Sequence, residues 1–526
     1  MKYKKNIIIA GFLLAFIFAI VATKQSGSPS GQFSGSTRGL AALQPSSVVE
    51  LKDGDTFELT ASRVKKNING NDVKMLAYNG SIPGPTLKVP QGATITVNFK
   101  NETDVETTVH SHGLRLENAF DGVPHVTQDP ILVGDSFTYK LTFPDAGTYW
   151  YHPHVREDYA QELGLYGNFL VTPKNPTYWN TVDREVPLFV DDILVEDGKI
   201  TPFYTKNADY ALMGRFGNTM LVNGETNYTQ SVEQGDVVRF SFTNSANVRP
   251  FRLAFEGTKM KLVGGDNGAY EKEEWVDTVT LGPSERAIVE VLFNKKGDIL
   301  LQNKTPDQTT TLGKIMVTES KRLRKPVFNF NTLHSNLETI KSIDPFRAFF
   351  TKALDKQISL SVSMMGGAAG NMSGGHMMPD GSMMGGNMMM SAPKGGIEWE
   401  DDGEMMSDQN SDQISWAILD QGTGKANMDI DWKFKVGDKV KIRIFNDPKS
   451  MHPMQHPIHF HGQRFLVLDK NGTAQKNLVW KDTVLVPAGE YADILLDISN
   501  PGEWMAHCHI AEHLEAGMMF GFTVEK

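Results

Sequence analysis

The sequence predicts an all-β protein made of three similar β-sandwich domains in line. From Val48 onward, short alternating or apolar runs are separated by Gly, Pro, Asn and Asp, and long helical periodicities are few. This sequence pattern is typical of strands joined by turns. The second observation is an internal repeat, which indicates that one module occurs three times along the chain.

Each copy of the repeat has a glycine, an alternating hydrophobic run, and an asparagine nine residues after the glycine. The copies run from Gly92 to Asn101, from Gly235 to Asn244 and from Gly437 to Asn446. The pattern predicts a turn followed by a half-buried strand in each module. We expect domains over residues 46–175, 182–320 and 326–526, with an insertion at 363–410 in the third.

The second half of the module repeats as well. Gly147 is followed by His152 and His154, and Gly502 is followed at the same spacing by His507 and His509. The middle copy, which starts at Gly297, has Gln302 and Lys304 at these positions. The middle module is therefore expected to keep the strands without the ligands, and to set the other two modules face to face.

Composition and the first residues restrict the class of protein. The chain has 52 basic and 62 acidic residues, a net charge of −10, which argues against nucleic acid as a partner. Lys2, Lys4 and Lys5 precede an apolar run, so residues 1–22 are expected to be a secretory signal peptide or, alternatively, an uncleaved anchor. Residues 23–45 are expected to be a flexible leader. We expect an exported monomer of the periplasm or cell envelope, with no other membrane contact.

Cys508 is the one cysteine of the chain, which excludes an intramolecular disulfide. His513 follows it by five residues, and Met518 follows His513 by five more. A thiolate, an imidazole and a distant thioether, with a second imidazole from elsewhere, form a blue-copper electron-transfer site. If the segment leaves a strand, the neighbouring His507 and His509 point away from Cys508. They could then hold other metal ions one residue from the thiolate.

Ten of the fourteen histidines fall in four clusters. Histidines at positions i and i+2 of a strand share one face. The four such pairs are His110 and His112, His152 and His154, His459 and His461, and His507 and His509. These eight imidazoles could converge between the first and third modules, and His456 is left over as the second nitrogen of the blue-copper site.

The four clusters resemble those of the multicopper oxidases (laccases, ascorbate oxidase and bacterial cuprous oxidases), and the likeness spans residues 75–526. Residues 79–85 are also similar to the signature of the family's first domain. The resemblance implies three cupredoxin-like Greek-key domains and four copper ions: one type 1, one type 2 and two type 3. It also implies that four one-electron oxidations of a substrate are coupled to the reduction of O2 to water.

Carried over by motif position, the type 1 copper takes His456, Cys508, His513 and axial Met518. The type 2 copper takes His110 and His459. The type 3 coppers take His112, His152 and His509 on one side, and His154, His461 and His507 on the other.

Oxygen reduction also needs protons. Asp121 follows the first histidine cluster, where relatives carry an acid thought to supply protons; the alternative is that Asp121 and Gly122 only form a turn. Leu514 stands where bacterial cuprous oxidases usually carry a glutamate, so a second relay there is doubtful. Glu512 and Glu515 are the candidate substitutes.

Twelve of the 24 methionines lie between Met364 and Met406, separated by Gly and Ser, which predicts a loop or loose hairpin. A low-complexity linker is the alternative. Thioethers prefer Cu(I) over harder cations, and Met428–Asp429 resembles a pairing at the substrate-copper site of cuprous oxidases. The candidate Cu(I)-binding residues are Met377, Met378, Met383, Met384, Met388, Met428 and Asp429.

These methionines favour Cu(I) as the electron donor, and copper tolerance as the role. A laccase-type oxidase of phenols or Mn(II) shares every copper ligand and is the first alternative. A non-catalytic envelope protein that buffers copper is the second, although such a protein has no use for an oxygen-reducing cluster. A copper nitrite reductase is disfavoured because it needs fewer histidines.

Overall fold

The computed structural model describes residues 33–203, 208–320, 330–364, 376–377, 383–384, 392–401 and 411–526; for residues 364, 376–377 and 383–384 it describes the backbone alone. The predicted signal peptide or anchor lies outside these residues. All helices and strands of the described residues belong to one compact unit, Gly35–Lys526. No helix in the described part of the chain is long and apolar enough to cross a membrane.

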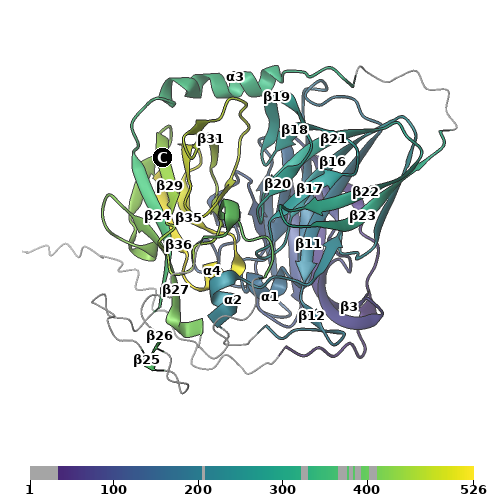
Figure 1. Cartoon of the computed structure of the whole chain (residues 1–526), viewed down its shortest axis with the longest axis horizontal. Coiled ribbons are helices and arrows are strands. Elements are labelled where there is room, and N and C mark those ends of the chain that lie inside the picture. Colours follow the sequence, from purple (N-terminus) through teal and green to yellow (C-terminus); the bar gives the residue numbers. More distant parts are fainter. Residues whose placement is uncertain are drawn as a thin grey trace, which may run out of the picture. The chain divides into compact units, whose positions relative to one another are not determined.

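The first module consists of two five-stranded sheets (Figure 1). One sheet holds β1 (Ala41–Ala42), β3 (Thr56–Ile68), β4 (Asn71–Tyr78), β6 (Thr94–Glu102) and β8 (Ser136–Thr142). The other holds β2 (Val48–Glu50), β5 (Thr86–Pro90), β7 (His110–His112), β9 (Gly147–His152) and β10 (Gly167–Thr172), and the short helices are η1 (Asn118–Phe120) and α1 (Glu157–Ala160). Because β1 pairs with β3, the sheet begins within the segment expected to be a flexible leader.

The second module repeats the two-sheet arrangement. Its larger sheet runs β14 (Thr219–Val222), β11 (Arg184–Ile193), β16 (Asp236–Asn244), β21 (Arg286–Phe293), β18 (Met260–Gly265) and β19 (Gly268–Val276). Its smaller sheet runs β15 (Tyr228–Glu233), β23 (Thr309–Thr318), β22 (Gly297–Lys304), β17 (Phe251–Phe255) and β20 (Val279–Leu281). A short ribbon of β12 (Val195–Glu196) and β13 (Lys199–Ile200), and helix α2 (Ala208–Met213), complete it.

The third module has the same two layers. One sheet runs β27 (Ile414–Asp420), β24 (Lys356–Met364), β29 (Lys439–Asn446), β34 (Tyr491–Asp497), β31 (Arg464–Lys470) and β32 (Thr473–Ala474). The other runs β28 (Trp432–Lys435), β36 (Met519–Glu525), β35 (Gly502–Cys508), β30 (His456–Phe460) and β33 (Thr483–Val486). The helices are α3 (Leu337–Ile343), η2 (Asp344–Phe349), η3 (Lys394–Gly396), η4 (Ser411–Gln413), η5 (Asn427–Asp429) and α4 (Ala511–Glu515). The predicted all-β fold is confirmed.

The asparagine that ends each copy of the repeat makes the same kind of hydrogen bonds in all three modules. The side-chain amide of Asn101 donates to the carbonyls of Val105 and Ile131. The Asn244 amide donates likewise to two carbonyls of its own module, and so does the Asn446 amide. Each asparagine thus ties the end of its strand to the loop that follows and to a second segment. Because backbone carbonyls buried there need donors, this explains why the repeat ends on asparagine.

The methionine-rich insertion is described at few positions. Strands β25 (His376–Met377) and β26 (Met383–Met384) pair antiparallel. Met378 and Met388 lie outside the described residues.

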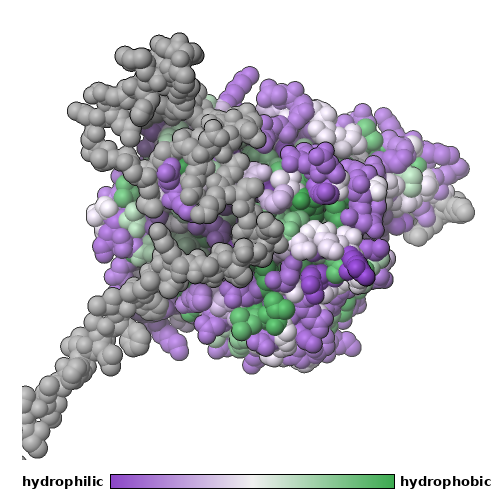
Figure 2. Space-filling view, turned by 90° about the horizontal axis from the view of Figure 1, so that it is seen from below, coloured by the Kyte–Doolittle hydropathy of each residue, from purple (hydrophilic) through white to green (hydrophobic). Residues whose placement is uncertain are grey.

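Alternating residues of the paired sheets form the hydrophobic cores. In the third module the core gathers residues from both sheets and includes Cys508, Met454 and Met518. The face of the molecule in Figure 2 is mainly hydrophilic, with small hydrophobic areas between. Helices α1, α2 and α4, one from each module, lie together (Figure 1).

Candidate metal centres

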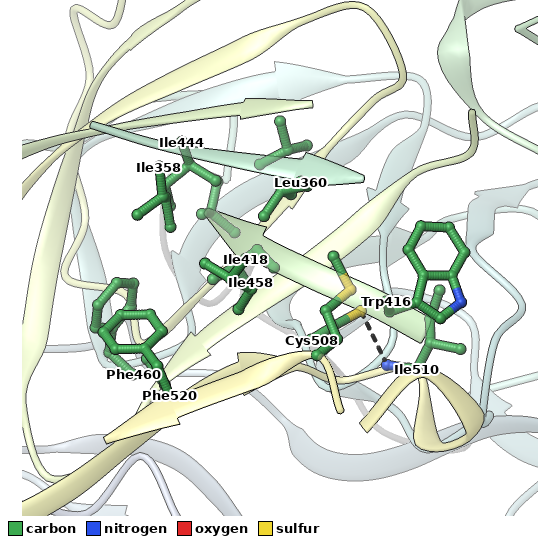
Figure 3. Packing of buried hydrophobic residues seen from close by; sticks show 14 of the residues in the cluster. Ile358, Leu360, Trp416, Ile418, Ile444, Ile458, Phe460, Cys508, Ile510 and Phe520 are labelled. Atoms are coloured by element: carbon green, nitrogen blue, oxygen red, sulfur yellow. Dashed lines mark hydrogen bonds between the residues drawn. The ribbon is translucent and has the colours of Figure 1, made fainter. Parts of the chain in front are cut away.

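Strand β35 lies between β30 and β36 and ends on Cys508. Cys508 is buried against Trp416 and Ile510, and the Ile510 amide donates to its sulfur over 3.5 Å (Figure 3). Burial raises the pKa of the Cys508 thiol well above its usual value. A thiolate at this position therefore needs a cation beside it.

Two imidazoles approach this sulfur. The Nδ1 atoms of His456 and His513 lie 3.6 and 3.7 Å from Cys508 Sγ, and all three side chains are fully buried. His513 is placed by α4, which begins three residues after the strand. The amide of Cys508 donates to the carbonyl of Met518, whose side chain is buried in the same core. The structure thus brings together the predicted type 1 residues.

The outer side of this group is covered by the second module. His513 Nε2 donates to the carbonyl of Leu212 over 3.0 Å, and Trp416 Nε1 donates to the carbonyl of Ala211 over 2.7 Å. Trp416 also stacks on the His513 ring, with centroids 4.1 Å apart. Helix α2 therefore lies over the His513 edge.

The eight paired histidines meet between the first and third modules. His110 faces His152 across β7 and β9, and His459 faces His507 across β30 and β35. All eight side chains are buried. Their nitrogens form three groups in which all ligand atoms lie within 4.8 Å of one another: His110, His112 and His459; His112, His152 and His509; and His154, His461 and His507. Two of these groups match the predicted type 3 sets, and the third contains the predicted type 2 pair.

The free ring nitrogens show that these groups suit a metal. The Nδ1 atoms of His110, His152 and His459 each bond to a backbone carbonyl, 2.7 to 2.9 Å away. Their Nε2 atoms are buried and have no hydrogen-bond partner among the described residues. The same is true of His154 Nε2. A buried polar atom without a partner is costly, and a metal ion would bind each of these lone pairs.

The charge state of the rings fits as well. Burial and the neighbouring imidazoles lower the pKa of His152, His459 and His507 well below the usual value. Burial likewise lowers the pKa of His509 to about 3. These four rings are therefore neutral at pH 7, which is the form that binds copper.

Two aspartates, Asp121 and Asp482, accept hydrogen bonds from imidazoles of these groups. Asp121 Oδ2 accepts from His461 Nδ1 over 2.9 Å. Burial alone would raise the pKa of Asp121, but the rings of His461 and His110 hold it well below its usual value. Asp121 follows η1, and Gly122 after it has a φ of +83°, so Asp121 lies at a bend of the chain and also contacts the cluster.

Asp482 and Glu157 were not predicted from the sequence. Asp482 Oδ1 accepts from His112 Nε2 over 3.0 Å, and Glu157 Oε1 lies 3.3 Å from His154 Nδ1. Burial raises the pKa of Glu157 well above its usual value. In the sequence, Asp482 stands out only as an acidic residue between two hydrophobic runs, 478–480 and 484–486.

The remaining candidates lie away from these groups. Met428 is 41% exposed on η5, and Asp429 joins none of the metal-capable groups of the described residues. The side chains of Met377, Met383 and Met384 are not described. On α4, Glu512 is partly buried and Glu515 is exposed, and neither joins those groups.

Comparison with known proteins decides the family. Family profiles described as multicopper oxidase match residues 60–176, 201–314 and 400–526, which together exceed half of the chain. This chain belongs to the multicopper oxidase family. Members bind copper, and use O2 and a one-electron donor. The three two-sheet modules are accordingly cupredoxin-like domains, and the protein is an oxidoreductase.

Relatives within the family carry several names. "Multicopper oxidase mco" of Staphylococcus aureus is 26% identical over 90% of this chain and 89% of its own. "Copper resistance protein A homolog" of Pseudomonas syringae pv. tomato is 25% identical over 90% of this chain and 93% of its own. A solved structure, "Multicopper oxidase from Campylobacter jejuni: a metallo-oxidase", is 25% identical with a TM-score of 0.65, and the match covers 94% of this chain and 99% of that one.

Proposed function

We propose that this multicopper oxidase is a cuprous oxidase that reduces O2 to water with four copper ions. His456, Cys508, His513 and Met518 would hold the type 1 ion, and His110 and His459 the type 2 ion. His112, His152 and His509, and His154, His461 and His507, would hold the type 3 ions. When bound, the copper ions supply one-electron redox chemistry and collect four electrons for oxygen reduction.

One observation carries the proposal. Cys508 belongs to the sulfur-containing group, which consists of His456, Cys508 and His513, and the two neighbours of Cys508 in the chain belong to the two predicted type 3 groups. His507 and His509 are joined to Cys508 by one peptide unit each. The chain thus offers a covalent path from the sulfur to both imidazole groups. Burial of all these side chains excludes bulk water from the path.

The protein's own acids orient the imidazoles. Asp121 accepts from His461 Nδ1, which directs the ring's other nitrogen toward His507 Nε2, 3.0 Å away. Asp121 is also the acid nearest to His110, at 3.3 Å from its Nδ1. This position supports Asp121 as the group that passes protons to the cluster.

The cover over His513 supports a small donor. A bulky phenol has no direct access to His513 Nε2, because the backbone of α2 occupies that position. The other imidazole, His456, has a buried Nε2 with no partner among the described residues. Electron donation is therefore proposed at His456.

The surroundings of His456 suit a soft cation. Met454 is fully buried two residues before His456, and Met451 packs against the same core. The buried Glu398 lies with Oε1 at 3.2 Å from His452 Nε2, while its Oε2 has no partner among the described residues. Thioethers select the soft Cu(I) over harder cations, and a carboxylate adds attraction for a positive charge. Glu398 lies within the insertion at 363–410, ten residues after Met388. This position supports delivery of Cu(I) from Met377, Met378, Met383, Met384 and Met388.

Steady-state oxygen uptake tests this proposal. With Cu(I) as donor, kcat/KM should exceed the value for a bulky phenol or for Mn(II). Faster turnover of the phenol would favour the laccase alternative. Absence of oxygen uptake with every donor would leave copper buffering as the function.

We further propose that the protein is exported and serves copper tolerance. The basic residues before the apolar run at residues 7–22 support export. Cell fractionation with an antibody tests this, because a cytoplasmic protein would contradict it.

A further inference from the structure

Arg286 is the first residue of β21 in the second module. None of the histidines of the three groups belongs to this module. Its guanidinium is fully buried and makes a two-pronged contact with the Asp482 carboxylate of the third module. Nη1 donates to Oδ1 over 2.7 Å, and Nη2 donates to Oδ2. Such a bidentate pair fixes both the position and the plane of the carboxylate.

Asp482 in turn contacts one histidine from each outer module. Its Oδ1 accepts from His112 Nε2 over 3.0 Å, and its backbone carbonyl lies 2.9 Å from His459 Nδ1. His112 is therefore turned the other way from His110, His152 and His459. Its Nδ1 is the buried nitrogen that has no partner among the described residues, whereas in the other three rings that nitrogen is Nε2. This orientation requires the ring proton on Nε2, where Asp482 accepts it.

The remaining donors of Arg286 join all three modules. Nε donates to the carbonyl of Thr148 over 3.2 Å, and Nη2 donates to Asn267 Oδ1 over 3.0 Å. Nη1 also donates to the carbonyl of Ser284. Because every side is bonded, the guanidinium has one position, and a lysine could not reproduce the planar fork.

A glycine makes room for the pair. Gly113 directly follows His112 with φ of +82°, and a Cβ there would overlap Asp482 Oδ2 and crowd Arg286 Nη2. The glycine of the His-Ser-His-Gly segment is thus required by the Arg286–Asp482 contact as well as by its backbone conformation.

We propose that Arg286 is a positioning residue for the cluster of eight paired histidines. Through Asp482 it fixes the orientation in which His112 presents Nδ1 to a metal. The inference rests on the proposed function, because it takes His112 as a ligand. It also gives the middle module a role beyond the spacing expected from the sequence.

The test compares copper-loaded full-length variants. Arg286→Lys keeps the charge and loses the fork, and Gly113→Ala displaces the same carboxylate from the other side. Arg239→Lys is the matched control, because Arg239 is a buried arginine of the same module that pairs with Glu290. The measurements are copper per chain, the paramagnetic resonance and near-ultraviolet signals of the cluster, and the blue absorption of the Cys508 site.

We expect Arg286→Lys and Gly113→Ala to keep the blue absorption, and to lose cluster copper to a chelator about tenfold or more faster than wild type. Arg239→Lys should keep both signals. Wild-type cluster signals and copper retention in Arg286→Lys would overturn the inference, and Gly113→Ala decides in the same way if Arg286→Lys does not fold. A wild-type protein that binds no copper would instead contradict the proposed function.

Discussion

The outer ring nitrogen of His513, Nε2, donates a hydrogen bond to the backbone carbonyl of Leu212 over 3.0 Å. The two residues belong to different modules, 301 positions apart. The middle module therefore closes the edge of the sulfur-containing group at which a bulky donor would otherwise reach a copper ligand.

Weakening the contact between α2 and the third module should allow larger electron donors to reach His513. Trp416→Phe keeps a ring on His513 but leaves the Ala211 carbonyl without its donor, which costs about 1 kcal/mol of unfolding free energy. We expect a several-fold rise in kcat/KM for a bulky phenol, measured by oxygen uptake. Trp432→Phe is the control, because Trp432 is a buried tryptophan of the same module whose Nε1 donates to Asp420. Equal phenol kinetics in the two variants would count against α2 as the barrier.

Glu398 should matter for Cu(I) and not for other donors. Glu398→Gln removes the charge beside His452 and should raise the KM for Cu(I) about tenfold, since a tenfold change corresponds to about 1.4 kcal/mol of binding free energy. Phenol kinetics and the blue absorption should stay unchanged. Glu400→Gln, on the same segment but paired with Arg249, is the control. An unaltered KM for Cu(I) in Glu398→Gln would place the donor site elsewhere.

The methionine-rich insertion can be tested apart from Glu398. Removing residues 365–391 leaves the segment 392–401 in place and takes away the candidate thioethers Met377, Met378, Met383, Met384 and Met388. We expect cuprous oxidase activity to fall and phenol turnover to be spared. Cuprous kinetics that do not change would mean that the insertion is a linker.

Asp121→Asn should separate the two half-reactions. The amide keeps the shape of the side chain but cannot carry a proton from solvent to the cluster. In stopped-flow measurements, we expect the blue absorption to be bleached by substrate at the wild-type rate and to return with O2 about a hundredfold more slowly. Equal loss in both steps would show that Asp121 is needed only for structure.

The buried Asp191 should make stability depend on pH. Burial and the neighbouring Asp192 raise the pKa of Asp191 to about 8, whereas an unfolded aspartate titrates near 3.9. Between these values the folded chain binds an extra proton at Asp191, so the contribution of this residue to the free energy of unfolding falls as pH rises, by roughly 1 kcal/mol per pH unit.

Asp191→Asn should therefore remove this contribution and make the slope of unfolding free energy against pH more positive than in the wild type, by roughly 1 kcal/mol per pH unit. The denaturant midpoint of the copper-loaded full chain, measured from pH 5 to pH 7, reports it. Asp298→Asn, in an exposed pair with Lys314, should keep the wild-type slope. A wild-type slope in Asp191→Asn would show that Asp191 is ionised in the fold.

The sequence predicted what is local and repeated. The histidines two residues apart converge as expected, although only β7 holds both members of a pair, and in the other three pairs the second histidine lies just beyond the end of the strand. The asparagine that ends each repeat has one role in three modules. It did not predict Leu212 over His513, or Arg286 behind Asp482. These contacts join modules far apart in the chain, and a backbone carbonyl or a single buried arginine leaves no local pattern. The prediction of a flexible leader over residues 23–45 was wrong at β1, where Ala41 and Ala42 pair with β3 through backbone groups alone.

The most direct test of the central claim is copper content and absorption of the purified, copper-loaded chain beside Cys508→Ser. Four coppers per chain and an intense blue colour are predicted for the wild type. Cys508→Ser should lose the colour and one copper, and keep the three at the imidazole groups. A colourless wild type, fewer than four coppers, or a blue Cys508→Ser variant would contradict the account.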